Sequence, residues 1–118
     1  MYEKTIKILI LLSFMAFSAV GFGQAHKTEQ IEVDLVSETR TVVPGETFWL
    51  GIHLNPIEHW HTYWKFGGDS GVETFISDWQ LPEGSIVGDI VWPIPEWTPF
   101  LGSELVTFTY EREVLLPI

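Results

Sequence analysis

The sequence contains no cysteine among its 118 residues. Small secreted domains are often held together by disulfides, and this chain cannot be. Its stability must therefore come from the burial of apolar side chains, for which six tryptophans and eight phenylalanines supply a large area. The lack of thiols also excludes any thiol–disulfide chemistry carried by these residues alone.

Positive charge is scarce as well. Six lysines and arginines stand against sixteen aspartates and glutamates, which gives a formal net charge of −10 at pH 7. An acidic surface repels phosphate backbones and anionic lipid head groups, so nucleic acids and membrane surfaces are unfavourable partners. The carboxylates are scattered along the chain, which is typical of a well-solvated surface.

The longest apolar run is too short to cross a bilayer. It covers residues 8–20, two lysines precede it, and small residues follow it. A transmembrane helix needs about 20 apolar residues, so this layout is that of a cleavable secretory signal peptide. The sequence predicts a signal peptide over residues 1–23 and one exported domain over residues 24–118.

Outside this segment no window shows the 3.6-residue period of an amphipathic helix. Short alternating segments recur instead, separated by turns rich in proline and glycine. We expect extended segments over residues 31–43, 48–54, 59–64, 74–80, 86–92, 105–110 and 114–118. This pattern predicts an all-β fold, an immunoglobulin-like antiparallel β-sandwich. Because the chain stops within an apolar run, we expect the domain to be truncated at its C-terminus, with further strands beyond Ile118.

The segment His59–Trp64 is unusually aromatic, and we expect it to form a central strand. Alternate side chains of a strand face opposite sides. One face would then carry polar tips, and the other would be almost wholly apolar. The expected sets are His59, His61 and Tyr63 on the first face and Trp60, Thr62 and Trp64 on the second. We expect the core to contain Trp60, Trp64, Trp79 and Trp92.

Two further segments shape the expected site. The glycine-rich turn over residues 67–71 permits positive φ values, and Asp69 is expected to hold this turn through its side chain. The stretch 93–99 contains three prolines, which excludes a central strand or a helix interior. We expect it to be a stiff extended connector on which Trp97 anchors either into the core or into a partner, and Trp97 is the best candidate for a partner contact.

The residues leave two alternative functions open. His59 and His61, with His53 from the preceding strand, could bind zinc or copper, although nothing fixes a fourth ligand and histidines more often pack or form hydrogen bonds. The aromatic side chains could instead form a stacking platform for carbohydrate. No cofactor is expected. No catalytic residue is predicted either, because the chain has no Ser-His-Asp signature, phosphate-binding loop or nucleophile elbow.

Several motifs follow one another in a distinctive order, and their spacing covers the chain from about Ile31 onward. They are His61-Thr62-Tyr63-Trp64, Gly68-Asp69-Ser70-Gly71, Trp79-x-Leu81-Pro82-Glu83-Gly84, Ile90-x-Trp92-Pro93-x-Pro95, Tyr110 and Val114-Leu115-Leu116-Pro117. Together they resemble the N-terminal periplasmic domain of the DsbD/ScsB family of thiol:disulfide interchange proteins (protein-disulfide reductases).

The resemblance implies an immunoglobulin-like sandwich in the periplasm. In such proteins this domain precedes a membrane-embedded domain and a thioredoxin-like domain, and electrons pass from cytoplasmic thioredoxin to periplasmic acceptors. The resemblance also implies a link to cytochrome c biogenesis and, through the ScsB branch, to copper tolerance. The implied partners are periplasmic thiol–disulfide proteins or sister domains of the same polypeptide.

The sequence departs from the family pattern in several places. Phe66-Gly67 stands where Asn-Pro is common, and Thr109 and Arg112 stand where glycines are usual. The redox cysteine pair is absent from this chain, so no catalytic residue can be transferred. The sequence therefore predicts a non-catalytic periplasmic module. Its candidate contact residues are Trp60, His61, Tyr63, Trp64, Asp69 and Trp97.

Overall fold

The computed structural model describes residues 25–100, 102 and 104–118. The expected signal peptide over residues 1–23 lies outside the described residues. Across the described part of the chain no helix is long and apolar enough to pass through a bilayer. The strands are β1 (His26–Lys27), β2 (Ile31–Ser37), β3 (Leu50–Pro56), β4 (Thr62–Gly68), β5 (Glu96–Pro99), β6 (Val106–Tyr110) and β7 (Val114–Pro117).

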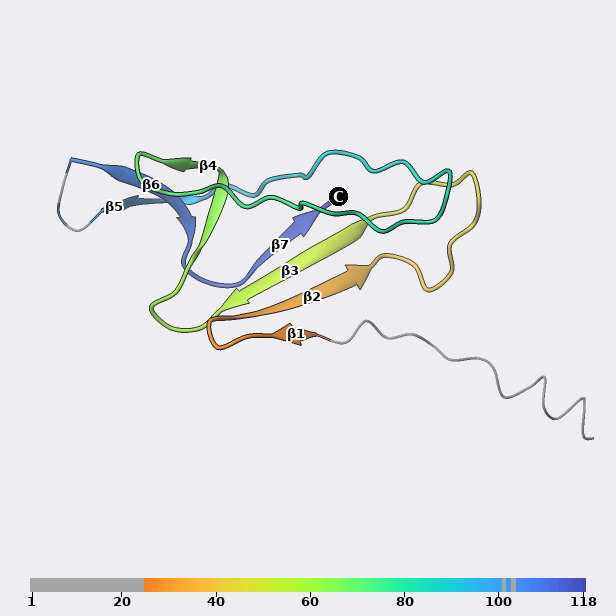
Figure 1. The fold of residues 1–118 in the computed structure, drawn as a ribbon, viewed down its shortest axis with the longest axis horizontal. Coiled ribbons are helices and arrows are strands. Elements are labelled where there is room, and N and C mark those ends of the chain that lie inside the picture. The colour runs from red at the N-terminus through yellow and green to blue at the C-terminus, as the bar shows by residue number, and fades with distance from the viewer. Residues whose placement is uncertain (1–24, 101, 103) are drawn as a thin grey trace, which may run out of the picture.

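The strands form two antiparallel sheets (Figure 1). Sheet A has the strand order β1-β2-β3-β7, and sheet B has the order β4-β6-β5. Every paired strand runs antiparallel to its neighbour. The prediction of an all-β fold, an antiparallel sandwich of the immunoglobulin-like kind, is confirmed.

Sheet A supplies most of the core. Leu35, Ile52 and Leu116 lie side by side on β2, β3 and β7, so they share the face that looks toward sheet B. Leu116 is only 1% exposed. The buried cluster consists of Ile52, Leu54, Val114 and Leu116 from sheet A and Tyr110 from sheet B. The two sheets therefore meet where Tyr110 enters the aliphatic core.

Sheet B is centred on β6. Tyr110 lies opposite Thr62 on β4, and the β4–β6 register shifts between Tyr63 and Gly68. On the other side of β6, Trp97 of β5 lies opposite Phe108. The register and the alternation of side chains place Trp97, Phe108 and Tyr110 on one face of the sheet.

The segments over residues 74–80 and 86–92 join neither sheet. The expectation of a strand over residues 74–80 is wrong, and Trp79 is 39% exposed instead of lying in the core. The second segment is extended beside β7, where Val91 N donates to Pro117 O at 2.7 Å. Trp92 packs against the core, as expected.

The proline-rich stretch ends in β5, at the free edge of sheet B. An edge strand tolerates proline because the N–H groups of its outer side have no partner to lose. The prediction that this stretch is not a central strand is confirmed. Its second half nevertheless pairs with β6, so it is more than a connector.

Candidate functional site

The aromatic segment begins with a turn. Trp60 N donates to Ile57 O at 3.0 Å, and His59 between them has a φ of 69°. A positive φ is uncommon outside glycine, and histidine is among the residues that adopt it. Because of this turn β4 starts only at Thr62, and Trp60 is 51% exposed. The predictions that the strand begins at His59 and that Trp60 lies in the core are wrong. The prediction of a central strand is also wrong, because β4 lies at an edge of sheet B and pairs only with β6.

A row of polar contacts runs along one face of sheet B, starting at His61. Its Nε2 lies 3.1 Å from the hydroxyl of Tyr63, and the two rings meet edge to face at 5.0 Å between centroids. Its Nδ1 lies 4.0 Å from Oε1 of Glu111, which also accepts a 3.0 Å hydrogen bond from Thr109 Oγ1. The prediction that His61 and Tyr63 share a face is therefore confirmed, although His61 lies just before β4. His59 lies in the preceding turn and does not share this face.

Aromatic side chains gather on the opposite face of sheet B, and we call Trp64, Phe66, Trp97 and Phe108 the aromatic shelf. The ring of Phe108 lies 5.9 Å from that of Trp64 and 6.0 Å from that of Phe66. Trp97 lies opposite Phe108, which places their Cβ atoms about 5 Å apart. Trp64 packs against the core as expected, but Phe66 and Trp97 are 59% and 65% exposed. The shelf thus leads from the core out to solvent.

The end of β4 is tied to the start of β6 by Asp69. Its Oδ2 accepts a hydrogen bond from Val106 N, and its own N donates to Val106 O, both at 2.8 Å. The preceding Gly68 has a φ of 86°, and a Cβ there would lie 2.2 Å from Val106 O. The expectation that Asp69 holds its own turn is corrected, because its side chain holds a neighbouring strand.

The three histidines considered as metal ligands lie in separate surroundings. Their acidic partners differ: Asp34 and Glu113 for His53, Glu58 for His59, and Glu111 for His61. Within residues 25–100, 102 and 104–118 no three His, Cys, Asp or Glu side chains are grouped so that they could hold a metal ion. The structure does not bring the predicted ligand set together.

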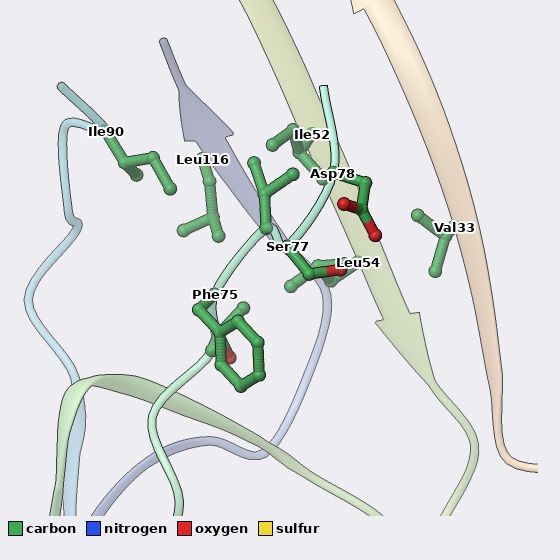
Figure 2. Close-up of a pocket in the computed structure, with 10 residues that line it drawn as sticks. Val33, Ile52, Leu54, Phe75, Ser77, Asp78, Ile90 and Leu116 are labelled. Carbon is green, nitrogen blue, oxygen red and sulfur yellow. The ribbon is translucent and has the colours of Figure 1, made fainter. Parts of the chain in front are cut away.

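A cavity of about 320 Å³ opens on the inner face of sheet A (Figure 2). Ile52, Leu54 and Leu116 form its floor, and the segment that carries Phe75 and Asp78 lies across it. Its lining is mainly apolar. The sequence did not predict this cavity, because the segment over it was expected to pair within a sheet.

Among the titratable groups of the described residues, Tyr110 is the one whose pKa is clearly shifted by the fold. Burial raises its pKa from the ordinary value of 10.0 to about 12, because the phenolate would be deprived of water. Its hydroxyl donates to Pro93 O at 2.8 Å, which satisfies the neutral form. Tyr110 therefore serves the structure as a neutral hydrogen-bond donor between the sheet and the proline-rich stretch.

The fold and these surfaces define a class of protein, a two-sheet antiparallel β-sandwich domain without cysteine. The chain belongs to the family described as "Thiol:disulfide interchange protein DsbD, N-terminal", whose model matches residues 32–118. The family suggested by the sequence motifs is thereby confirmed. Searches of curated proteins and of solved structures gave no match.

The structure adds two residues to the candidate contact surface. Phe66 and Phe108 were not among the predicted contact residues, yet both belong to the aromatic shelf. The sequence contained a signal for each of them, because residues two positions apart on a strand share a face. Phe66 lies two positions after Trp64, and Phe108 lies midway between Val106 and Tyr110. What the sequence could not supply was the register that places β4 and β5 on either side of Phe108.

Proposed function

We propose that the protein is a non-catalytic module of a thiol:disulfide interchange protein, and that it docks thiol–disulfide proteins or sister domains. The observation that carries this proposal is the family match over residues 32–118 in a chain without cysteine. Thiol–disulfide exchange proceeds by attack of a thiolate on a disulfide. A chain without sulfur nucleophiles contributes to such a reaction by contact.

Exposed aromatic side chains support a contact role. Trp97 and Phe66 are more than half exposed. Both are neighbours of Phe108 on one face of sheet B. Exposed aromatics are enriched where proteins bind one another. Of the predicted contact residues, Trp64 and Trp97 belong to this shelf, whereas His61 and Tyr63 lie on the opposite face and Trp60 lies at a turn.

The periplasm is the proposed location. The order of lysines, an apolar run and small residues at the N-terminus favours export by a cleaved signal peptide. Cell fractionation should recover the protein with periplasmic markers, and recovery with cytoplasmic markers would contradict this location.

The docking role is tested with the purified 118-residue chain and a panel of purified thioredoxin-like proteins in reduced and oxidised forms. Calorimetry should detect binding of at least one of them, while the protein alone should not reduce insulin. Reduction of insulin by the protein alone would overturn the non-catalytic role. Failure of every thioredoxin-like protein to bind would overturn the docking role.

A further inference from the structure

The cavity on the inner face of sheet A has a buried apolar floor. Ile52, Leu54 and Leu116 form this floor and are only 9%, 7% and 1% exposed. The segment that carries Phe75 and Asp78 lies across it (Figure 2). Because the floor has so little contact with solvent, the space above it is narrow. Apolar cavities bind apolar molecules in preference to water.

The volume of the cavity limits the size of a ligand. Ligand pockets in proteins start at about 300 Å³, and this cavity measures about 320 Å³. If each non-hydrogen atom takes about the 30 Å³ of a water molecule, the cavity holds about ten such atoms. It therefore fits one slender chain or one ring, and it is too small for a peptide segment of several residues.

One charged side chain, Asp78, lines the cavity. It forms no ion pair with any described lysine, arginine or histidine. Asp78 is exposed, so its carboxylate lies at the margin of the cavity, above an apolar floor (Figure 2). A lining of this kind complements a ligand that has an apolar body and one cationic end.

The segment over the cavity is anchored by one hydrogen bond at each end. Thr74 Oγ1 donates to Tyr63 O at 2.6 Å, and Val91 N donates to Pro117 O at 2.7 Å. Between these anchors, the described residues 75–90 form no hydrogen bond to either sheet. Apolar packing holds this part of the segment against the core instead. It can therefore move away from sheet A at the cost of apolar contacts, which an apolar ligand replaces.

We propose that this cavity binds a small amphiphile with an apolar tail and a single ammonium group. The tail lies on the floor formed by Ile52, Leu54 and Leu116, and the ammonium group pairs with the carboxylate of Asp78. The lining of the cavity shares no residue with the aromatic shelf. The proposal therefore does not depend on the docking role proposed above.

The test uses the purified 118-residue chain and three probes of equal chain length, namely n-octylammonium, octan-1-ol and octanoate. Calorimetry at low ionic strength measures each dissociation constant. The ammonium probe should bind about threefold more tightly than the alcohol, because a partly solvated ion pair adds only modestly to the burial of the tail. Octanoate should bind more weakly than both, because Asp78 repels it. Absence of binding by n-octylammonium, or equal binding of the ammonium probe and the alcohol, would overturn the proposal.

The role of Asp78 is separated from that of the overall negative charge by a pair of variants. Asp78→Asn should make the dissociation constants of n-octylammonium and octan-1-ol equal. Glu83→Gln is the matched control, because it removes one negative charge from the same segment at an exposed residue that does not line the cavity. It should leave the threefold difference unchanged. Loss of the difference in both variants, or in neither, would overturn the assignment of Asp78.

The position of the tail is tested by filling the cavity. Ser77 lines the cavity but is exposed, so Ser77→Phe adds a ring there and leaves the buried core residues in place. It should weaken binding of n-octylammonium about tenfold, because the ring occupies the space of the tail. Ser85→Phe adds the same ring at an exposed serine outside the cavity and should leave binding unchanged. Equal binding by the two variants would overturn the proposal.

The length of the tail gives a second measurement that needs no variant. Each methylene buried in the cavity tightens binding about fourfold, so n-hexylammonium should bind the wild type more than tenfold more weakly than n-octylammonium. Equal affinities of the two probes would show that the tail stays in solvent, which would overturn the proposal.

Discussion

The two sheets use their apolar side chains differently. The inner face of sheet A is aliphatic, and its centre is buried, with Leu116 only 1% exposed and Leu54 7% exposed, although Leu35 on β2 is 62% exposed. The corresponding face of sheet B is aromatic, and Trp97 is 65% exposed. Burial of apolar area stabilises the fold, whereas exposed aromatic area is available for contact. We therefore expect stability to depend chiefly on sheet A, and the docking proposed above to depend on sheet B.

The largest expected effect is in sheet A. Leu116→Ala should lower the free energy of unfolding by about 2–5 kcal/mol, because it removes a buried side chain and leaves a cavity. Urea denaturation of the full-length protein measures this change. The adjacent Leu115 points to the other face and is 45% exposed, so Leu115→Ala should cost less than about 1 kcal/mol. Equal losses for the two variants would contradict the conclusion that the inner face of sheet A carries most of the stability.

The next largest effect is at the junction of β4 and β6. Gly68→Ala should destabilise the protein by about 2–4 kcal/mol, because a Cβ would meet Val106 O and the positive φ would be strained. Gly84 is the matched control, since its φ of 85° is nearly the same but a Cβ there has no atom within 4 Å. Gly84→Ala should cost about 1–2 kcal/mol in the same denaturation experiment. A smaller loss at Gly68 than at Gly84 would mean that β4 and β6 are not so closely apposed.

The contact between the sheets should be sensitive to alkali through Tyr110. Its pKa is raised to about 12, so the folded state retains a proton that the unfolded state loses above pH 10. Stability should therefore be unaffected below pH 10 and fall by about 2–3 kcal/mol as the pH rises to 12. Denaturation curves across this range measure the loss, and phenolate absorbance reports the titration.

Tyr110→Phe separates this titration from general alkaline damage. The variant lacks the hydrogen bond to Pro93 O and should lose about 1 kcal/mol at neutral pH. Because phenylalanine does not ionise, the free energy of unfolding of the variant should not show the fall between pH 10 and pH 12 that Tyr110 causes in the wild type. If the variant declines as steeply as the wild type, Tyr110 is not the group responsible.

The smallest effect is expected on the aromatic shelf. Trp97→Ala should change the free energy of unfolding by no more than about 0.5 kcal/mol, because its side chain is largely exposed. Thermal unfolding followed by circular dichroism measures this. A loss as large as that of Leu116→Ala would show that sheet B contributes to stability as much as sheet A does.

Strand alternation predicted the parts of the fold that are half buried. β2 and β6 fall within segments identified from period-two alternation, and β3 overlaps a third such segment but continues to Pro56. β7 falls within the apolar run at residues 114–118, which was also expected to be a strand. Their pairing order was not predictable, because it depends on contacts between residues far apart in the sequence. The dependence of pairing on distant residues also explains the error at residues 74–80. This segment was expected to be a strand from its sequence, but it lies across the cavity and pairs with neither sheet.

The candidate site was predictable only in part. His61 and Tyr63 were correctly placed on one face. Trp97, predicted as a partner contact, is 65% exposed. Trp60 was misplaced because the turn at His59 uses a positive φ at a residue other than glycine, which the sequence does not signal clearly. Phe66 and Phe108 became candidates only through the register of sheet B.

The crossing from β6 to β7 has a mechanical consequence. Three residues separate Tyr110, at the end of sheet B, from Val114, at the start of sheet A, and both of these side chains are buried. On either side of this link, His61 contacts Glu111 and His53 contacts Glu113. A connection of three residues allows little independent movement of the two sheets. We therefore expect that a partner bound at the aromatic shelf would move both sheets together.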